Sequence, residues 1–334
     1  LDPNEILFPR TLIFAILLSS KLTKANPFFK ALNKCPFSID IFSIDPKPIR
    51  CAGAIFVTST TDVIIGDEKM SYDHLLNPIT PTTNLACQFT NNSVNNSETD
   101  LTGDGGSIFI TRGAAVTVNG CGFDNNQVLK GNGGVLGIHG REVTFNFYRS
   151  IFKGNKAKRG GVLYMNLRSR VLVEKCHASG NNAVLDGGVF YCADQSALIW
   201  KTTSSKLNTA DGSGGVGYVD GLAALDVTTC TFNENSAQYY GGVLYLTHVK
   251  SPSPGGGGGY DKVINVLDST LQDNKAKQGG SVYWPYTNDN PESIFKPINC
   301  ELLDNYPSRE GLATGTVRDR LNRWHPYVRS GRLA

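Results

Sequence analysis

The chain has 334 residues, of which 36 are glycine and only 18% are charged, a low share of charge for a mixed globular protein. Its formal net charge of +3 is small and scattered, which argues against nucleic acid as a partner. The length would hold two average domains, but an internal repeat runs through most of the chain and predicts one elongated body.

The N-terminal segment has the features of a secretory signal peptide. Arg10 precedes the apolar run 11–18, and Ala25 stands at a suitable cleavage position. We therefore predict a signal peptide over residues 1–25 and a secreted or cell-surface protein; a buried first strand or a capping helix is the alternative. The sequons that begin at Asn91 and Asn95 predict glycosylation sites, which agrees with secretion.

A glycine pair followed by a short aliphatic run recurs seven times along the chain. The steps between consecutive pairs are 28, 27, 27, 27, 27 and 38 residues, and the insertion 251–259 lengthens the last step. A fixed period of this kind predicts a solenoid, in which each repeat buries its apolar face against its neighbours. The pairs are Gly105-Gly106, Gly133-Gly134, Gly160-Gly161, Gly187-Gly188, Gly214-Gly215, Gly241-Gly242 and Gly279-Gly280.

Each repeat contains short β-rich segments and no 3.6-residue periodicity. A strand such as 161–165 follows the glycine pair, and a second segment such as 171–176 follows a polar corner. A Phe-x-x-Asn unit, as at 152–155, then leads to the next pair. The pattern excludes a helical solenoid and predicts an all-β, single-stranded parallel β-helix over residues 26–305, with coils of roughly 27 residues. We expect residues 306–334 to form a basic, irregular tail.

Stacked coils place equivalent residues about 4.8 Å apart, so each position of the repeat becomes a column along the axis. Aliphatic residues that alternate along a strand, such as Leu163 and Met165, are assigned to the core. A second core column comprises Val118, Phe147, Val173, Trp200, Val227 and Val266. The asparagine of the Phe-x-x-Asn unit predicts a structural ladder of side-chain hydrogen bonds. This ladder comprises Asn126, Asn155, Asn181, Asn208, Asn235, Asn274 and Asn305.

A row of tyrosines stands between the aliphatic residues that follow the glycine pairs. If those neighbours point inward, the tyrosine rings point outward on a pleated strand. Two interpretations remain open: the rings stack on one another and cover the backbone, or they form a docking surface for a glycan or a partner protein. The candidate binding residues are Tyr164, Tyr191, Tyr218 and Tyr245.

The cysteines share one repeat position with serine and threonine. From Cys121 onward they fall on alternate coils, roughly 9.6 Å apart by the strand spacing, which is too far for a disulfide. A small buried slot is therefore expected, with one disulfide left open between Cys87 and Cys121 and a weaker alternative between Cys35 and Cys51. No Cys-x-x-Cys occurs, so neither zinc nor another metal is predicted.

The Gly-Gly-aliphatic strands, as at 161–165, together with the Phe-x-x-Asn corners resemble the repeats of polymorphic outer membrane proteins. They also resemble the wider right-handed parallel β-helix group that includes pectin lyase-like proteins. The resemblance covers about residues 85–305, with an echo at 52–55, and it implies a right-handed β-helix. For the first family it implies a secreted passenger that mediates adhesion. This chain departs from that family by using mainly Gly-Gly-Val in place of Gly-Gly-Ala-Ile.

We expect a structural or adhesive module that binds a glycan or a surface protein, without a cofactor and with membrane association only through a part that this chain does not contain. The alternative is a carbohydrate-active enzyme, a polysaccharide lyase or hydrolase. Its acids would come from Asp104, Asp186, Asp211 and Asp220, which are dispersed along the repeat, so no catalytic residue is assigned. Arg159 and Asp186 are expected to be neighbours on consecutive coils and to form an exposed ion pair.

Overall fold

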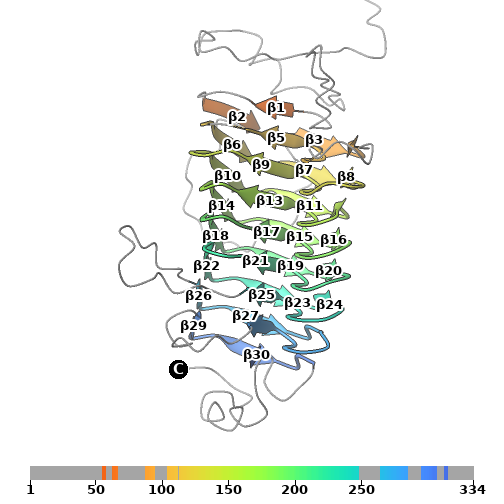
Figure 1. Ribbon diagram of the computed structural model, residues 1–334, viewed down its shortest axis with the longest axis vertical. Helices are drawn as coiled ribbons and strands as arrows, with labels where there is room; N and C mark the ends of the chain where they lie inside the picture. The colour runs from red at the N-terminus through yellow and green to blue at the C-terminus, as the bar shows by residue number, and fades with distance from the viewer. Residues whose placement is uncertain are drawn as a thin grey trace, which may run out of the picture.

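The computed structural model describes residues 55–57, 62–66, 87–94, 104–111, 113–247, 264–284, 295–306 and 312–314. Within these ranges every regular element is a β-strand, and the strands wind one elongated right-handed parallel β-helix (Figure 1). The predicted fold class is therefore confirmed. The predicted signal peptide, the insertion 251–259, Asn95, Cys35 and Cys51 lie outside the described residues.

Four parallel sheets run along the axis, and each coil adds one strand to each of the three larger sheets. Sheet A contains β1 (Ile55–Val57), β5 (Ile108–Ile110), β9 (Leu136–His139), β13 (Leu163–Asn166), β17 (Phe190–Cys192), β21 (Gly217–Val219), β25 (Leu244–Leu246), β28 (Val282–Trp284) and β31 (Leu312–Thr314). Sheet B contains β2 (Asp62–Gly66), β6 (Ala115–Asn119), β10 (Thr144–Tyr148), β14 (Arg170–Glu174), β18 (Ala197–Lys201), β22 (Ala224–Thr228), β26 (Ile264–Leu267) and β29 (Phe295–Ile298).

Sheets C and D complete the coil. Sheet C contains β3 (Cys87–Thr90), β7 (Cys121–Asp124), β11 (Ile151–Lys153), β15 (His177–Ser179), β19 (Ser204–Lys206), β23 (Thr231–Asn233), β27 (Thr270–Gln272) and β30 (Glu301–Leu303). Sheet D consists of short strands: β4 (Ser93–Val94), β8 (Gln127–Val128), β12 (Lys156–Ala157), β16 (Asn182–Ala183), β20 (Thr209–Ala210) and β24 (Ser236–Ala237).

The register keeps equivalent repeat positions directly above one another. Leu163 pairs with Phe190, and Tyr191 pairs with Tyr218, each 27 positions further on. The glycine pairs align along one edge, because the amide of Gly161 donates to the carbonyl of Gly187 at 3.1 Å and equivalent bonds join the other coils. A Cβ at Gly161 would collide with the carbonyl oxygen of Gly188, so only glycine lets the backbones approach this closely.

The interior of the β-helix is filled by the residues that alternation assigned to it. Leu163 and Met165 of sheet A are buried, and so is the whole column from Val118 to Val266 on sheet B. Phenylalanine rings of sheet C stack along the axis, with the centroids of Phe89 and Phe123 4.9 Å apart. Where Ala178 and Ser205 replace phenylalanine in this column, the larger Trp200 enters the core from sheet B. These buried columns make each coil depend on its neighbours for its core.

The asparagine column forms a continuous ladder inside the turn between sheets C and D. The side-chain oxygen of Asn181 accepts bonds from the backbone amide and the side-chain amide of Asn155, both at 2.9 Å. The side-chain amide of Asn181 donates to Asn208 at 2.9 Å and to the carbonyl of Phe152 at 3.0 Å. The same pattern runs from Asn92 to Asn305, so the ladder begins one coil before the predicted first member.

The β-helix extends beyond the predicted boundary at residue 305. β31 lies in the segment expected to be an irregular tail, and it pairs with β28 through Val282 and Leu312. The edge of a parallel sheet carries unpaired backbone groups, and a further strand satisfies them even where the repeat motif has faded. At the other end, β1 pairs with β5 and corresponds to the sequence echo at 52–55.

Candidate functional site

The tyrosine row of sheet A is a continuous aromatic stack. The ring centroids of Tyr164 and Tyr191 are 5.6 Å apart, and those of Tyr191 and Tyr218 are 4.8 Å apart. Tyr245 continues the stack at 4.8 Å from Tyr218, and Tyr283 follows at 5.6 Å. The interplanar angles range from 6° to 30°, so the rings lie face to face along the axis. We call these five residues the tyrosine stripe.

His139 extends the tyrosine stripe where the sequence places a glycine. Gly137 pairs with Tyr164 in the ladder but has no ring, and the imidazole of His139 stacks on Tyr164 with centroids 5.2 Å apart. The imidazole Nε2 contacts the carboxylate of the buried Asp104. Sequence reasoning missed His139, although it follows Gly137 by two positions and therefore points to the same side of the strand.

The ring faces of the tyrosine stripe cover one another, so its partly exposed members offer ring edges and not ring faces to the surface. Tyr191 is only 8% exposed, and its ring lies between those of Tyr164 and Tyr218. Tyr164, Tyr218 and Tyr245 are partly exposed. Burial raises the pKa of the Tyr164, Tyr191 and Tyr218 hydroxyls, so all three stay protonated and can donate hydrogen bonds.

The expected ion pair between Arg159 and Asp186 does not form in the described structure. The two residues do lie on neighbouring coils, since the amide of Gly160 donates to the carbonyl of Asp186. The guanidinium of Arg159 instead lies over the Tyr191 ring, 5.5 Å from its centroid. Its Nε is buried and has no hydrogen-bond partner among the described residues. A cation over the face of an aromatic ring is attracted by the negative charge of that face.

Two carboxylates border the middle of the tyrosine stripe on opposite sides. Asp220 accepts a bond from the Tyr191 hydroxyl at 3.1 Å and another from the Thr247 hydroxyl at 2.9 Å. The carboxylate of Asp186 accepts a hydrogen bond from the backbone amide of Ser213 at 3.0 Å. Burial raises the pKa of Asp186 and the charge of Asp220 adds to this shift, while Arg159 and the Ser213 amide oppose it. Acids that are 34 positions apart in sequence therefore face the same aromatic stack, whereas Asp104 lies at its N-terminal end beside His139.

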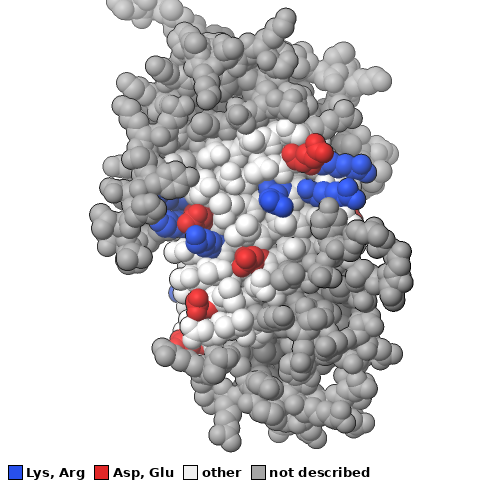
Figure 2. Space-filling model, turned by 90° about the vertical axis from the view of Figure 1, so that its left-hand side faces the viewer, with Lys and Arg blue, Asp and Glu red and all other residues white. Residues whose placement is uncertain are grey.

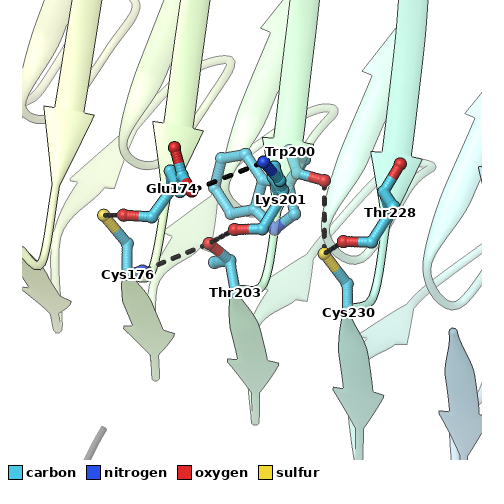
Figure 3. A network of polar contacts seen from close by, with 7 residues as sticks. All are labelled: Glu174, Cys176, Trp200, Lys201, Thr203, Thr228 and Cys230. Atoms are coloured by element: carbon cyan, nitrogen blue, oxygen red, sulfur yellow. Dashed lines mark hydrogen bonds and ion pairs between the residues drawn. The ribbon is translucent and has the colours of Figure 1, made fainter. Parts of the chain in front are cut away.

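The cysteine column is a second hydrogen-bonded ladder, on the inner side of the turn between sheets B and C (Figure 3). The amide of Cys176 donates to the Thr203 hydroxyl at 3.2 Å, and the Thr203 hydroxyl donates to the carbonyl of Lys201 at 2.9 Å. The thiol of Cys230 donates to the carbonyls of Trp200 and Thr228, both at 3.2 Å. This position requires a small side chain that both donates and accepts, which Cys, Ser and Thr all satisfy.

The cysteines of this ladder are free, as their alternate placement predicts. Cys121, Cys176, Cys230 and Cys300 are buried free thiols. Cys87 and Cys121 pair directly in register, yet both are free here, and the disulfide left open by the sequence is not formed.

The outer surface of sheet B is a weaker candidate for a binding site than the tyrosine stripe. Figure 2 shows this side as a mainly uncharged face with isolated charges of both signs. One ion pair joins Lys201 and Glu174 across neighbouring strands at 3.6 Å. No cluster of three or more side chains suited to a metal ion occurs in the described ranges. The described residues likewise include no helix long and apolar enough to span a membrane.

The first predicted glycosylation site lies on the surface. Asn91 is exposed and has a left-handed backbone with φ of 57°, whereas the adjacent Asn92 is buried in the asparagine ladder. The geometry leaves the Asn91 side chain accessible, and glycosylation there stays a prediction.

Residues 229–247 match the family model of the Chlamydia polymorphic membrane protein repeat. This segment runs from the turn after β22 through β23 and β24 to the end of β25, and it includes a Phe-x-x-Asn unit and a glycine pair. The chain thus carries repeats of this polymorphic membrane protein type, and the repeat and the β-helix together fit a surface protein. No curated protein and no solved structure matches the chain at a significant level.

Proposed function

We propose that this chain is a surface-displayed, secreted β-helix that acts as an adhesive module and binds a glycan or a protein partner along sheet A. The observation that carries the proposal is the tyrosine stripe with its polar borders. It combines several partly exposed tyrosine hydroxyls with Arg159 and Asp186 on one side and Asp220 on the other. The polymorphic membrane protein repeat supports the surface location.

The stacking geometry specifies how such a partner would be recognised. Because the ring faces are covered, a sugar cannot lie flat on a tyrosine in the middle of the stripe. The partner would instead receive hydrogen bonds from a row of hydroxyls spaced by the ring distances of 4.8–5.6 Å. An extended chain with hydroxyl or carbonyl groups at a similar repeat suits this arrangement, and both linear glycans and extended peptides meet that description.

Conservative substitutions can test the hydroxyl row without removing the stack. A variant with Tyr164→Phe, Tyr218→Phe and Tyr245→Phe retains the rings and loses three donors. We expect it to lose at least tenfold in affinity on an array of immobilised glycans and extracellular proteins, since each donated bond contributes about 1 kcal/mol. Tyr239→Phe and Tyr306→Phe are the control, because both tyrosines are exposed and lie outside the stripe. Equal binding by the triple variant and the unmodified protein would remove the stripe as the binding site.

A carbohydrate-active enzyme is the second candidate, favoured by the placement of Asp186 and Asp220 around one aromatic stack. The raised pKa of Asp186 is a property expected of a general acid. Reducing-end release from acidic and neutral polysaccharides would be measured with the unmodified protein and with Asp186→Asn. Turnover that disappears in this variant would favour the enzyme over the adhesive module.

A further inference from the structure

The outer face of sheet C separates its charges into two blocks along the axis. The three middle coils present Arg149, Lys153, Lys175, His177 and Lys206, and none of residues 149–154, 175–180 and 202–207 is Asp or Glu. The three C-terminal coils present Glu234, Asp268, Asp273, Glu301 and Asp304, and none of residues 229–234, 268–273 and 299–304 is Lys or Arg. We call these sets the basic block and the acidic block.

The strand register puts the two blocks on common columns. Lys175 and Asp268 occupy the turn that precedes sheet C, in a left-handed conformation with φ of 54° and 48°. Backbone bonds join this column from coil to coil, from Lys175 to Lys201 and finally from Asp268 to Ile298. Glu234 and Asp304 share the column that follows sheet C, next to the column of Lys153 and Lys206.

Like charges stacked at the strand spacing of about 4.8 Å repel one another. On the N-terminal side of the basic block, Lys153 pairs in register with Asp124 and favours its charged form. Where the blocks meet, Lys206 and Glu234 form an ion pair at 3.1 Å. Lys153 and Lys175 form no ion pair with any described residue. The adjoining sheet D does not share the separation, because Lys156 and Lys275 lie beside opposite blocks.

We propose that sheet C binds a second copy of this chain in antiparallel orientation. The two-fold axis would run along the strand direction, in the plane of the interface, between β19 and β23. It places β11 opposite β30, β15 opposite β27 and β19 opposite β23 of the partner copy. Since this axis keeps each column opposite its own equivalent, Lys175 faces Asp268 of the partner copy. Lys153 lies beside Asp304 of the partner copy, and Lys206 lies beside its Glu234. Every contact occurs twice, as an isologous interface requires.

The size of the face determines how strong this dimer can be. Six strands at about 4.8 Å and six residues at about 3.3 Å give a face of about 29 by 20 Å. The total buried area is then about 1,200 Å², the lower limit for a specific interface. Complementary charges at such an interface mainly guide association and register. The dimer is therefore weak and strongly dependent on ionic strength.

Sedimentation velocity on the full chain tests the proposal. At about 20 mM salt we expect a concentration-dependent dimer, and at about 500 mM salt, where charges are screened within a few ångströms, at least tenfold weaker association. Lys153→Glu with Lys175→Glu places carboxylates opposite Asp304 and Asp268 of the partner copy and should abolish the dimer. Asp268→Lys with Asp304→Lys places lysines opposite Lys175 and Lys153 of the partner copy and should do the same. A mixture of the two variants should form a heterodimer, because the reversed charges of one variant then face opposite charges on the other.

The matched control carries Lys156→Glu and Lys158→Glu, which change the net charge equally on sheet D and should leave the dimer intact. Thermal unfolding of each variant establishes that it is folded. Two monomeric variants that do not associate on mixing would overturn the proposal. So would an unmodified protein that stays monomeric at low salt. If that monomer binds heparin through Lys153 and Lys175, the basic block serves an anionic polymer instead.

Discussion

Replacing one member of the asparagine ladder should destabilise the β-helix far more than replacing its exposed neighbour. Asn181 is fully buried, and its side chain makes four hydrogen bonds to the two adjacent coils. In Asn181→Ala, the amide of Asn155, a side-chain N–H of Asn155 and the carbonyl of Phe152 each lose a partner. The oxygen of Asn208 keeps one, because the backbone amide of residue 181 still donates to it at 3.0 Å.

The magnitude follows from the number of groups left unsatisfied. A buried donor or acceptor without a partner costs about 1–3 kcal/mol, and three such groups give about 3–5 kcal/mol after partial relaxation. The control, Asn182→Ala, removes one partly buried bond to Thr209 and should cost about 1 kcal/mol or less. The two variants delete the same atoms at adjacent positions, so their difference isolates the ladder.

Urea unfolding followed by fluorescence provides the measurement, since Trp200 is buried in the coil next to Asn181. With a slope of about 3 kcal/mol per molar urea, the midpoint of Asn181→Ala should fall by about 1–1.7 M. Hydrogen exchange at the Asn155 amide should accelerate in the same variant, because opening there becomes local. Midpoints that agree within about 0.3 M for the two variants would refute the account of the ladder as a set of cooperative bonds.

Three further predictions follow from single positions. Gly161→Ala should lower the free energy of unfolding by several kcal/mol, because the added Cβ collides with the carbonyl of Gly188. Gly180→Ala has open space around the added Cβ and should cost only the roughly 1–2 kcal/mol of a left-handed backbone. Urea titrations of the two variants would show whether their stabilities differ. Burial raises the pKa of the Cys176 thiol to about 12, so maleimide should label it only after unfolding, and labelling at the rate of a free thiol in the folded protein would contradict the buried slot. Because burial also raises the pKa of Asp186, ionisation of this carboxyl opposes folding at neutral pH, and the penalty disappears as the pH falls below the unfolded pKa of 3.8. Asp186→Asn should therefore stabilise the protein near pH 7 but not near pH 3. An equal effect at both pH values would refute the direction of this pKa shift.

Much of the fold was predictable because residues one repeat period apart in sequence are neighbours in the folded chain. Once Gly160 and Gly187 are placed in neighbouring coils, each residue's contacts along the axis are the residues about 27 positions away. The core column, the asparagine ladder and the cysteine slot all follow from this rule. The rule fails at the ends, where the strand 312–314 joins sheet A without any repeat motif.

The candidate site was predictable only in part. The tyrosine row follows from the period, but its borders do not, because they depend on long side chains that reach across columns. Arg159 illustrates this: the expected carboxylate partner is on the next coil, yet the guanidinium lies over Tyr191. Asp220 likewise meets the Tyr191 hydroxyl from the following coil.

The architecture of this protein follows from its repeat: parallel coils, aligned glycine pairs, a buried asparagine column and an aromatic row on one face. These features repeat, and stacking converts each repeated residue into a contact with its own kind. The contacts of non-repeating residues, in contrast, became visible in the folded chain, where His139 takes the place of a missing ring and Arg159 lies over Tyr191. The direction and reach of a single side chain depend on its local packing, and no periodicity encodes them.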